Sequence, residues 1–166
     1  QLPPVVAAFK AFEAGAKSVN PNVKLRTAYV GDWDDASAAR EQARAQIARG
    51  ADVIFQDADA AGLGVFQAAR QSRTVRIIGS NSDQNGVAPE VTLGSVVIDL
   101  PRAMMIIARD VKSGAFKGHV YRLGENDGVV RWVPNPRLAP EILPATVARL
   151  DSARKLIDAK TLKVPE

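Results

Sequence analysis

The chain has 166 residues, of which 46% are hydrophobic and 24% charged, the size and composition of one ordinary domain with a packed core. Intrinsic disorder is excluded, and the longest apolar stretches fall far short of the ~20 residues that a membrane-spanning helix needs. The net charge is +4, but the basic residues are interspersed with acidic ones and form no basic stripe, and aromatic residues make up only 5% of the chain. We therefore expect no nucleic-acid partner. The absence of cysteine excludes disulfides, thiol catalysis and cysteine-based zinc sites.

The first half of the chain alternates helical and extended patterns. Apolar residues recur every three or four positions from Val5 to Val19, which predicts an amphipathic helix. Alternation of apolar and polar residues predicts a strand over Val23–Val30. Four further elements are predicted next: a helix from Asp34 to Arg49, a strand over Asp52–Gln56, a helix over Leu63–Gln71 and a strand over Val75–Gly79. This order favours an α/β fold with a parallel sheet and flanking helices.

The second half of the chain changes character. After a polar loop over Ser80–Glu90, the patterns predict a strand over Val91–Ile98 and a helix from Pro101 that ends at Gly114. The segments His119–Leu123 and Val129–Val133 are predicted to pair as a hairpin with a long loop. A last helix is predicted from Pro144 to Ala159.

Polar residues gather where three successive strands are predicted to end. In an open parallel sheet, ligands bind beyond the carboxyl ends of the strands, where helix N-termini and loop amides point. We therefore predict one ligand crevice at these ends. Its predicted ligand-binding residues are Trp33, Asp57, Asp59, Asn81 and Asp83.

Each of these residues also has a purely structural interpretation. Asp34, Asp35 and Asp59 stand where helix N-caps belong. Trp33 could instead lie partly buried under its own loop. His119, the single histidine, has no serine or cysteine nucleophile motif near it, and we interpret it as structural.

Enzyme motifs are mostly absent from the sequence. The run Asp57-x-Asp59 resembles the start of a calcium loop, but Ala61 and Ala68 occupy ligand positions five and twelve, which excludes an EF-hand. An Asp-dependent phosphatase that uses Asp57 stays open as a minor alternative. Convergent polar loops without an activated nucleophile predict binding without catalysis, and we expect no catalytic residue, no metal and no cofactor.

Several short runs, in the correct order along the chain, carry a family resemblance. They are Ala11-Phe12-Glu13-Ala14-Gly15-Ala16-Lys17, Tyr29-Val30-Gly31-Asp32-Trp33-Asp34-Asp35, Gly50-Ala51-Asp52-Val53-Ile54-Phe55-Gln56, Gly62-Leu63-Gly64-Val65-Phe66-Gln67-Ala68-Ala69, Ser82-Asp83-Gln84 and Ser95-Val96-Val97. With these runs the chain resembles the basic membrane protein family, substrate-binding proteins of ABC transporters that include purine-nucleoside-binding lipoproteins.

The resemblance implies a type I periplasmic-binding fold, with two α/β lobes that close over a ligand, of which this chain supplies mainly the second. It implies a ligand-binding lobe over residues 1–90, a crossover strand and helix toward the missing first lobe over 91–115, and a return hairpin and C-terminal helix over 116–166. If that lobe is missing, Met104, Met105, Ile106 and Ile107 should not all be shielded within the chain, and the fragment could self-associate.

The resemblance also implies a function: an extracytoplasmic protein, periplasmic or membrane-anchored, that delivers a small polar ligand to an ABC permease. The ligand is nucleoside-like by family default. Asn81 stands where nucleoside-binding relatives carry a ribose-binding Asp, and Ile98 stands where they commonly carry Lys. The alternative is a cytoplasmic regulator with an effector-binding domain of the same fold.

Overall fold

The computed structural model describes residues 2–165, so residues 1 and 166, the outer ends of the predicted units, lie outside it. The helices are α1 (Pro3–Val19), α2 (Ala36–Ala48), α3 (Gly62–Ser72), α4 (Leu100–Ser113) and α5 (Pro144–Asp158). The strands are β1 (Val53–Phe55), β2 (Arg76–Asn81), β3 (Thr92–Ile98) and β4 (Val130–Pro134).

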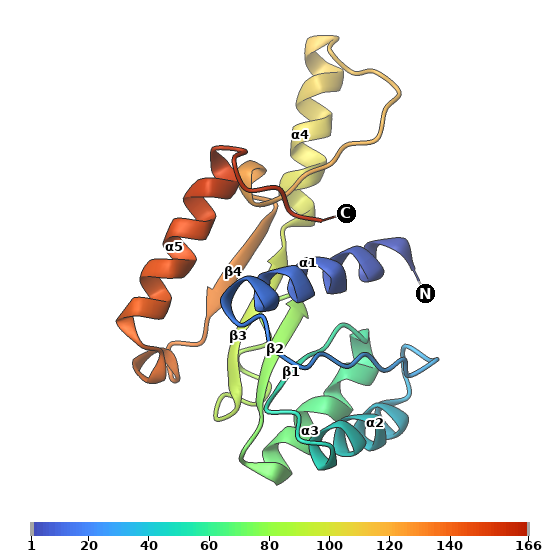
Figure 1. Cartoon of the computed structure of the whole chain (residues 1–166). Helices are drawn as coiled ribbons and strands as arrows, with labels where there is room; N and C mark the ends of the chain where they lie inside the picture. Colours follow the sequence, from blue (N-terminus) through green and yellow to red (C-terminus); the bar gives the residue numbers. More distant parts are fainter. Residues whose placement is uncertain (1, 166) are drawn as a thin grey trace.

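The strands form one sheet in the order β1-β2-β3-β4 (Figure 1). β1, β2 and β3 are parallel, as the alternation of helices and strands along the sequence predicted. Ile54 of β1 lies opposite Ile77 of β2. β4 runs antiparallel to β3, with Val97 opposite Arg131, so the sheet is mixed. The fold is the predicted α/β class with one antiparallel edge strand, an arrangement common in large α/β folds.

The core lies between the sheet and the helix pair α2 and α3. Phe66 of α3 and Ile77 of β2 are almost fully buried, and the small side chains of Ala39 and Ala43 let α2 pack closely on α3. Because side chains alternate along a strand, Ile54 faces this core while the neighbouring Phe55 faces the other way. There the ring of Phe55 meets α1, which Figure 1 shows crossing on the opposite side from α2 and α3.

The segment Val23–Val30 differs from the predicted strand. It is extended, but it joins no sheet, and no backbone hydrogen bond connects residues 24–31 to another element in the described part of the chain. The alternating pattern predicted a strand, and the prediction is wrong in that the extended backbone pairs with nothing among the described residues. What is missing is a neighbouring strand at hydrogen-bonding distance.

The predicted hairpin is wrong. His119–Leu123 forms no strand, and β4 pairs instead with the edge of β3. An isolated two-stranded hairpin is marginal in water, whereas β3 offers an edge on an already packed sheet. The loop before β4 folds back on α4: the Tyr121 hydroxyl donates to Asp110 at 2.7 Å, which raises the pKa of Tyr121, and His119 stacks on the Tyr121 ring.

Helix α4 projects away from the sheet (Figure 1). Met104 and Met105 are 63% and 54% exposed, and Ile106 and Ile107 are only half-buried. The prediction that these four side chains are not all shielded is therefore confirmed. That a first lobe covers them, or that the fragment self-associates, stays a prediction.

Candidate functional site

Two predicted site residues meet at the carboxyl ends of β1 and β2. Asp57 follows β1, Asn81 ends β2, and the two strands are parallel neighbours. The Asn81 side-chain amide donates to Asp57 Oδ1 at 2.9 Å, and the Ser80 hydroxyl donates to the same oxygen at 3.3 Å. The geometry of parallel strand ends therefore brings a carboxylate and an amide into direct contact.

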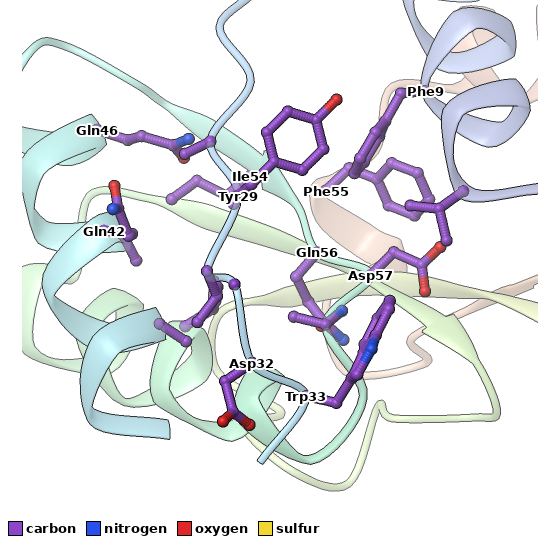
Figure 2. Close-up of a pocket in the computed structure, with 18 of the residues that line it drawn as sticks. Phe9, Tyr29, Asp32, Trp33, Gln42, Gln46, Ile54, Phe55, Gln56 and Asp57 are labelled. Carbon is purple, nitrogen blue, oxygen red and sulfur yellow. The ribbon is translucent and has the colours of Figure 1, made fainter. Parts of the chain in front are cut away.

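Trp33 lies at the same end of the sheet. Its carbonyl accepts a 2.7 Å hydrogen bond from the Ala61 amide, which ties it to the 3-10 turn Asp59–Ala61. Trp33 and Asp57 also line one pocket of about 410 Å³, and Figure 2 shows both at the same end of it. We call Trp33, Asp57, Asp59 and Asn81 the rim.

Asp83 is exposed two residues beyond Asn81, and its carboxylate accepts from the Asn85 backbone amide at 3.0 Å. This bond stays within its own loop, so the carboxylate shapes the turn that follows the rim. The structure therefore brings Asp57 and Asn81 into contact and places Trp33 on the same pocket as Asp57, whereas Asp59 and Asp83 are exposed in the loops that follow Asp57 and Asn81. That any of the five binds a ligand stays a prediction.

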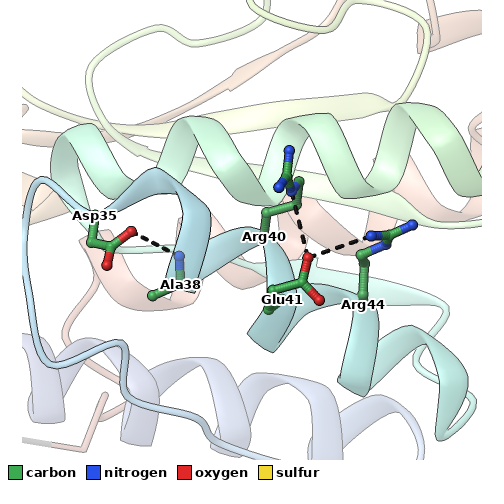
Figure 3. A network of polar contacts seen from close by, with 5 residues as sticks. All are labelled: Asp35, Ala38, Arg40, Glu41 and Arg44. Atoms are coloured by element: carbon green, nitrogen blue, oxygen red, sulfur yellow. Dashed lines mark hydrogen bonds and ion pairs between the residues drawn. The ribbon is translucent and has the colours of Figure 1, made fainter.

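The interpretation of these aspartates as helix N-caps is correct for Asp35 and wrong for Asp59. Asp35 caps α2 by accepting from the Ala38 amide at 2.8 Å (Figure 3). Further along α2, Glu41 lies between Arg40 and Arg44 (Figure 3). Asp59 is not a cap, because Ala61 holds the N-cap position of α3.

Two rim residues adopt a backbone conformation that is rare outside glycine. The φ angles of Asp59 and Asn81 are 53° and 65°. Asp and Asn tolerate this left-handed region better than most residues, yet it still costs free energy and is concentrated at functional sites. The strain makes the rim a stronger candidate site than its polarity alone.

Sequence reasoning missed a pair of glutamines beneath the rim. Gln56 is buried and donates from Nε2 to Gln84 Oε1 at 2.6 Å, while its own Oε1 accepts from the Ala58 amide. Gln84 Oε1 also accepts from the Ser80 amide at 3.0 Å. A Cβ at Gly62 would overlap the Gln56 amide group, so a glycine there makes room for the pair. The signal in the sequence was a glutamine directly after the apolar run Val53-Ile54-Phe55.

The glutamine pair continues as a chain of hydrogen bonds into the sheet. The Gln84 backbone amide donates to Ser95 Oγ at 3.0 Å, and Ser95 Oγ donates to Asn85. The Asn85 amide donates in turn to the carbonyls of Val133 and Pro134 on β4. We call Gln56, Gln84, Ser95 and Asn85 the amide chain. It connects the loop after β2 to β1, β3 and β4.

The Gln84→Met variant is expected to loosen the Asn81 side of the rim. Methionine keeps the length of the side chain but leaves the Ser80 amide and Gln56 Nε2 without an acceptor, at a cost of about 1–3 kcal/mol in unfolding free energy. We expect amide exchange at Ser80 to accelerate at least tenfold, measured by NMR, with α2 and α3 unchanged. Gln84→Glu keeps the acceptor oxygen and should restore protection. If the Ser80 amide of Gln84→Met exchanged at the wild-type rate, its hydrogen bond to the Gln84 side chain would be contradicted.

The rim presents mainly hydrogen-bond acceptors. Both contacts to Asp57 fall on Oδ1, so within residues 2–165 its Oδ2 has no partner, and the Asp59 carboxylate has none either. Beside them stands the indole of Trp33, which is 47% exposed. In the described part of the chain no group of three or more His, Asp or Glu side chains is placed to hold a metal ion. The rim can stack a planar group and accept hydrogen bonds from hydroxyls or amines.

Polar, acceptor-rich strand ends with an exposed aromatic residue are typical of ligand-binding α/β domains. The comparison with known families is more specific. The family described as "ABC transporter substrate-binding protein PnrA-like" matches the chain over residues 1–166, and the chain belongs to it. This confirms the resemblance stated from the sequence runs.

Relatives and solved structures agree with this membership. Basic membrane protein A of Borreliella burgdorferi is 32% identical over 165 residues, 97% of this chain and 48% of that protein. A purine-binding protein of Brucella abortus is 28% identical over 141 residues, 85% of this chain and 39% of that protein. A solute-binding protein of an ABC transporter system from Conexibacter woesei superposes with a TM-score of 0.76 at 25% identity, over 99% of this chain and 54% of that one. The chain thus spans about half the length of the curated relatives it matches.

Proposed function

We propose that the chain is the greater part of one lobe of an extracytoplasmic solute-binding protein that delivers a small polar ligand to an ABC permease. The ligand is nucleoside-like and binds at the rim, between this lobe and a second one. The observation that carries the proposal is the direct Asn81–Asp57 contact beside Trp33 at the strand ends. Among residues 2–165 no helix is both long and apolar enough to cross a bilayer.

The chemistry of the rim supports a purine nucleoside. The half-exposed indole of Trp33 offers a flat apolar face, and stacking a base on such a face contributes about 1–3 kcal/mol. The free oxygens of Asp57 and Asp59 can accept hydrogen bonds from ribose hydroxyls or an exocyclic amine. The purine-binding relative from Brucella abortus is consistent with this ligand class.

The acidity of the rim argues against a phosphorylated ligand. Asp57 and Asp59 belong to the rim, and Asp83 lies beside it. A phosphate group would bring like charges together without a compensating cation from these residues, which costs affinity. The rim therefore favours a nucleoside over the corresponding nucleotide.

Equilibrium titration of the protein at its natural length tests the proposal. We expect adenosine or inosine to bind at least tenfold more tightly than uridine, because a purine stacks over a larger area, and at least tenfold more tightly than AMP. The 166-residue chain should bind more weakly than the longer protein, since the opposite lobe supplies the other half of the contacts. Failure of every nucleoside to bind, or equal binding of AMP and adenosine, would reject the proposed ligand.

A further inference from the structure

Asn81 lies at the apex of a tight turn of three residues. The Ser82 backbone amide donates to the Ser80 carbonyl at 2.7 Å, and the φ angle of Asn81 between them is 65°. A three-residue turn with a positive φ at its centre is rare and strained, and such strain persists only where surrounding contacts hold it. The contacts that hold this turn therefore decide where the Asn81 side chain points.

Ser80 is the fixed side of the turn. It is only 5% exposed, and its backbone amide donates to Gln84 Oε1 at 3.0 Å. Its hydroxyl donates to Asp57 Oδ1, the same oxygen that the Asn81 side chain contacts. Because Ser80 directly precedes Asn81, the Gln84 side chain acts on the position of Asn81 through the backbone of Ser80.

Gln56 holds Asp57 in a similar way. Its Oε1 accepts from the Ala58 backbone amide at 3.2 Å, so the Gln56 side chain reaches across Asp57 to the residue that follows it. Its Nε2 donates to Gln84 Oε1 at 2.6 Å. The ends of β1 and β2, which carry Asp57 and Asn81, are therefore joined through a single atom, Gln84 Oε1.

The two glutamines have different roles in this joint. Gln84 Oε1 accepts two hydrogen bonds, whereas Gln56 donates with one end of its amide and accepts with the other. A carboxylate has only acceptor atoms, so it can replace the amide of Gln84 and cannot replace that of Gln56. This difference gives the joint a chemical signature that a general packing role does not have.

Two glycines make room for the glutamine pair. A Cβ at Gly62 would overlap Gln56 Oε1, and a Cβ at Gly79 would lie 2.8 Å from Gln84 Oε1. Neither glycine has a positive φ, so the backbone conformation does not require glycine at these positions. The space that the two amide groups occupy does require it.

We propose that Gln56 and Gln84 are positioning residues of the rim: their hydrogen bond sets the place of Asp57 relative to Asn81, and the affinity for the ligand depends on it. The inference rests on the proposed function, because it takes the rim as the binding site. A site whose polar groups are held in place before binding loses less conformational entropy when the ligand arrives. Loosening the joint should therefore weaken binding even though Asp57 and Asn81 are both retained.

Titration of the protein at its natural length with adenosine gives the first test. Gln56→Met and Gln84→Met remove the hydrogen bond between the two side chains, and we expect each to weaken binding at least tenfold. Gln84→Glu keeps an oxygen that accepts from both donors, so its affinity should stay within threefold of the wild-type value. A loss in Gln84→Glu as large as in Gln84→Met, or unchanged affinity in both methionine variants, would overturn the proposal.

Val75→Ala separates positioning from a general loss of stability. Val75 is 1% exposed and directly precedes β2, at the opposite end of that strand from Asn81. Its truncation leaves a cavity in the core, which destabilises the fold without removing any contact of the glutamine pair. Urea unfolding should show a destabilisation comparable with that of Gln84→Met, while the affinity for adenosine stays within twofold. A tenfold loss of affinity in Val75→Ala would overturn the proposal, because the rim would then respond to stability alone.

The Asn81 side chain of the ligand-free protein gives the second test. Its Nδ2 group donates to Asp57 Oδ1, which slows the exchange of that proton with water. NMR should show this exchange at least fivefold faster in Gln84→Met and in Gly79→Ala, which displaces the Gln84 side chain while every polar group is kept. Exchange at the wild-type rate in both variants would overturn the proposal. If the wild type binds no adenosine, the proposed ligand is rejected, and this measurement alone decides the positioning role.

Discussion

Gly64→Ala is expected to destabilise the fold by about 3 kcal/mol or more, a large part of the stability of an ordinary domain. Gly64 lies in α3 where it crosses α2, and a Cβ there would overlap the carbonyl oxygen of Ala36 and press on the Arg40 amide. These are backbone atoms of a helix, so they cannot move aside without separating α2 from α3. Urea unfolding followed by circular dichroism measures the change.

Gly15→Ala is the matched control for that variant. Gly15 also lies inside a helix, α1, but a Cβ there meets nothing within 4 Å. Alanine should therefore stabilise the chain by about 0.5–1 kcal/mol, because glycine loses more conformational entropy in a helix. Equal effects of the two substitutions would show that the contact between α2 and α3 is looser than the structure indicates.

Trp33→Ala is expected to weaken nucleoside binding to the full-length protein at least tenfold. The loss of base stacking, about 1–3 kcal/mol, is the physical reason. Trp33→Phe keeps an aromatic face and should retain most of the affinity. Because Trp33 is 47% exposed, neither substitution should change the unfolding free energy by more than about 0.5 kcal/mol. Unchanged affinity in Trp33→Ala would make this residue a loop-packing side chain.

Much of the fold could be predicted from local sequence patterns. The start of α2 followed from the capping chemistry of Asp34 and Asp35, of which Asp35 is the cap. The short strand β1 followed from three apolar residues bounded by polar ones, although only Ile54 of the three is buried. The failures are the strands whose partners lie elsewhere in the chain. Segment 24–31 has the sequence of a strand but no partner beside it. β4 pairs with the edge of β3 and not with the segment His119–Leu123, which precedes it in the sequence. Pairing is a tertiary property, which local periodicity does not contain.

The candidate site shows the same division. The rule that parallel strand ends converge predicted that Asp57 and Asn81 lie together, and their side chains are in contact. Gln56 and Gln84 escaped notice because an amide pair is recognised only when two side chains meet across 28 residues. Asp59 was as plausible a helix cap as Asp35, and only the position at which α3 begins separates the two roles.

The amide chain makes the two sides of the rim unequal in their freedom to move. Asn81 precedes a loop that Gln84 and Asn85 fasten to three strands, so its geometry is set before a ligand arrives. Trp33 sits on a bend held to the following turn through the Ala61 amide, and its side chain stays half-exposed. Ordering this bend lowers its conformational entropy when a ligand binds, whereas the Asn81 side adds little to that cost. Substitutions that stiffen the backbone between Gly31 and Asp34 therefore offer a route to tighter binding that adds no contact with the ligand.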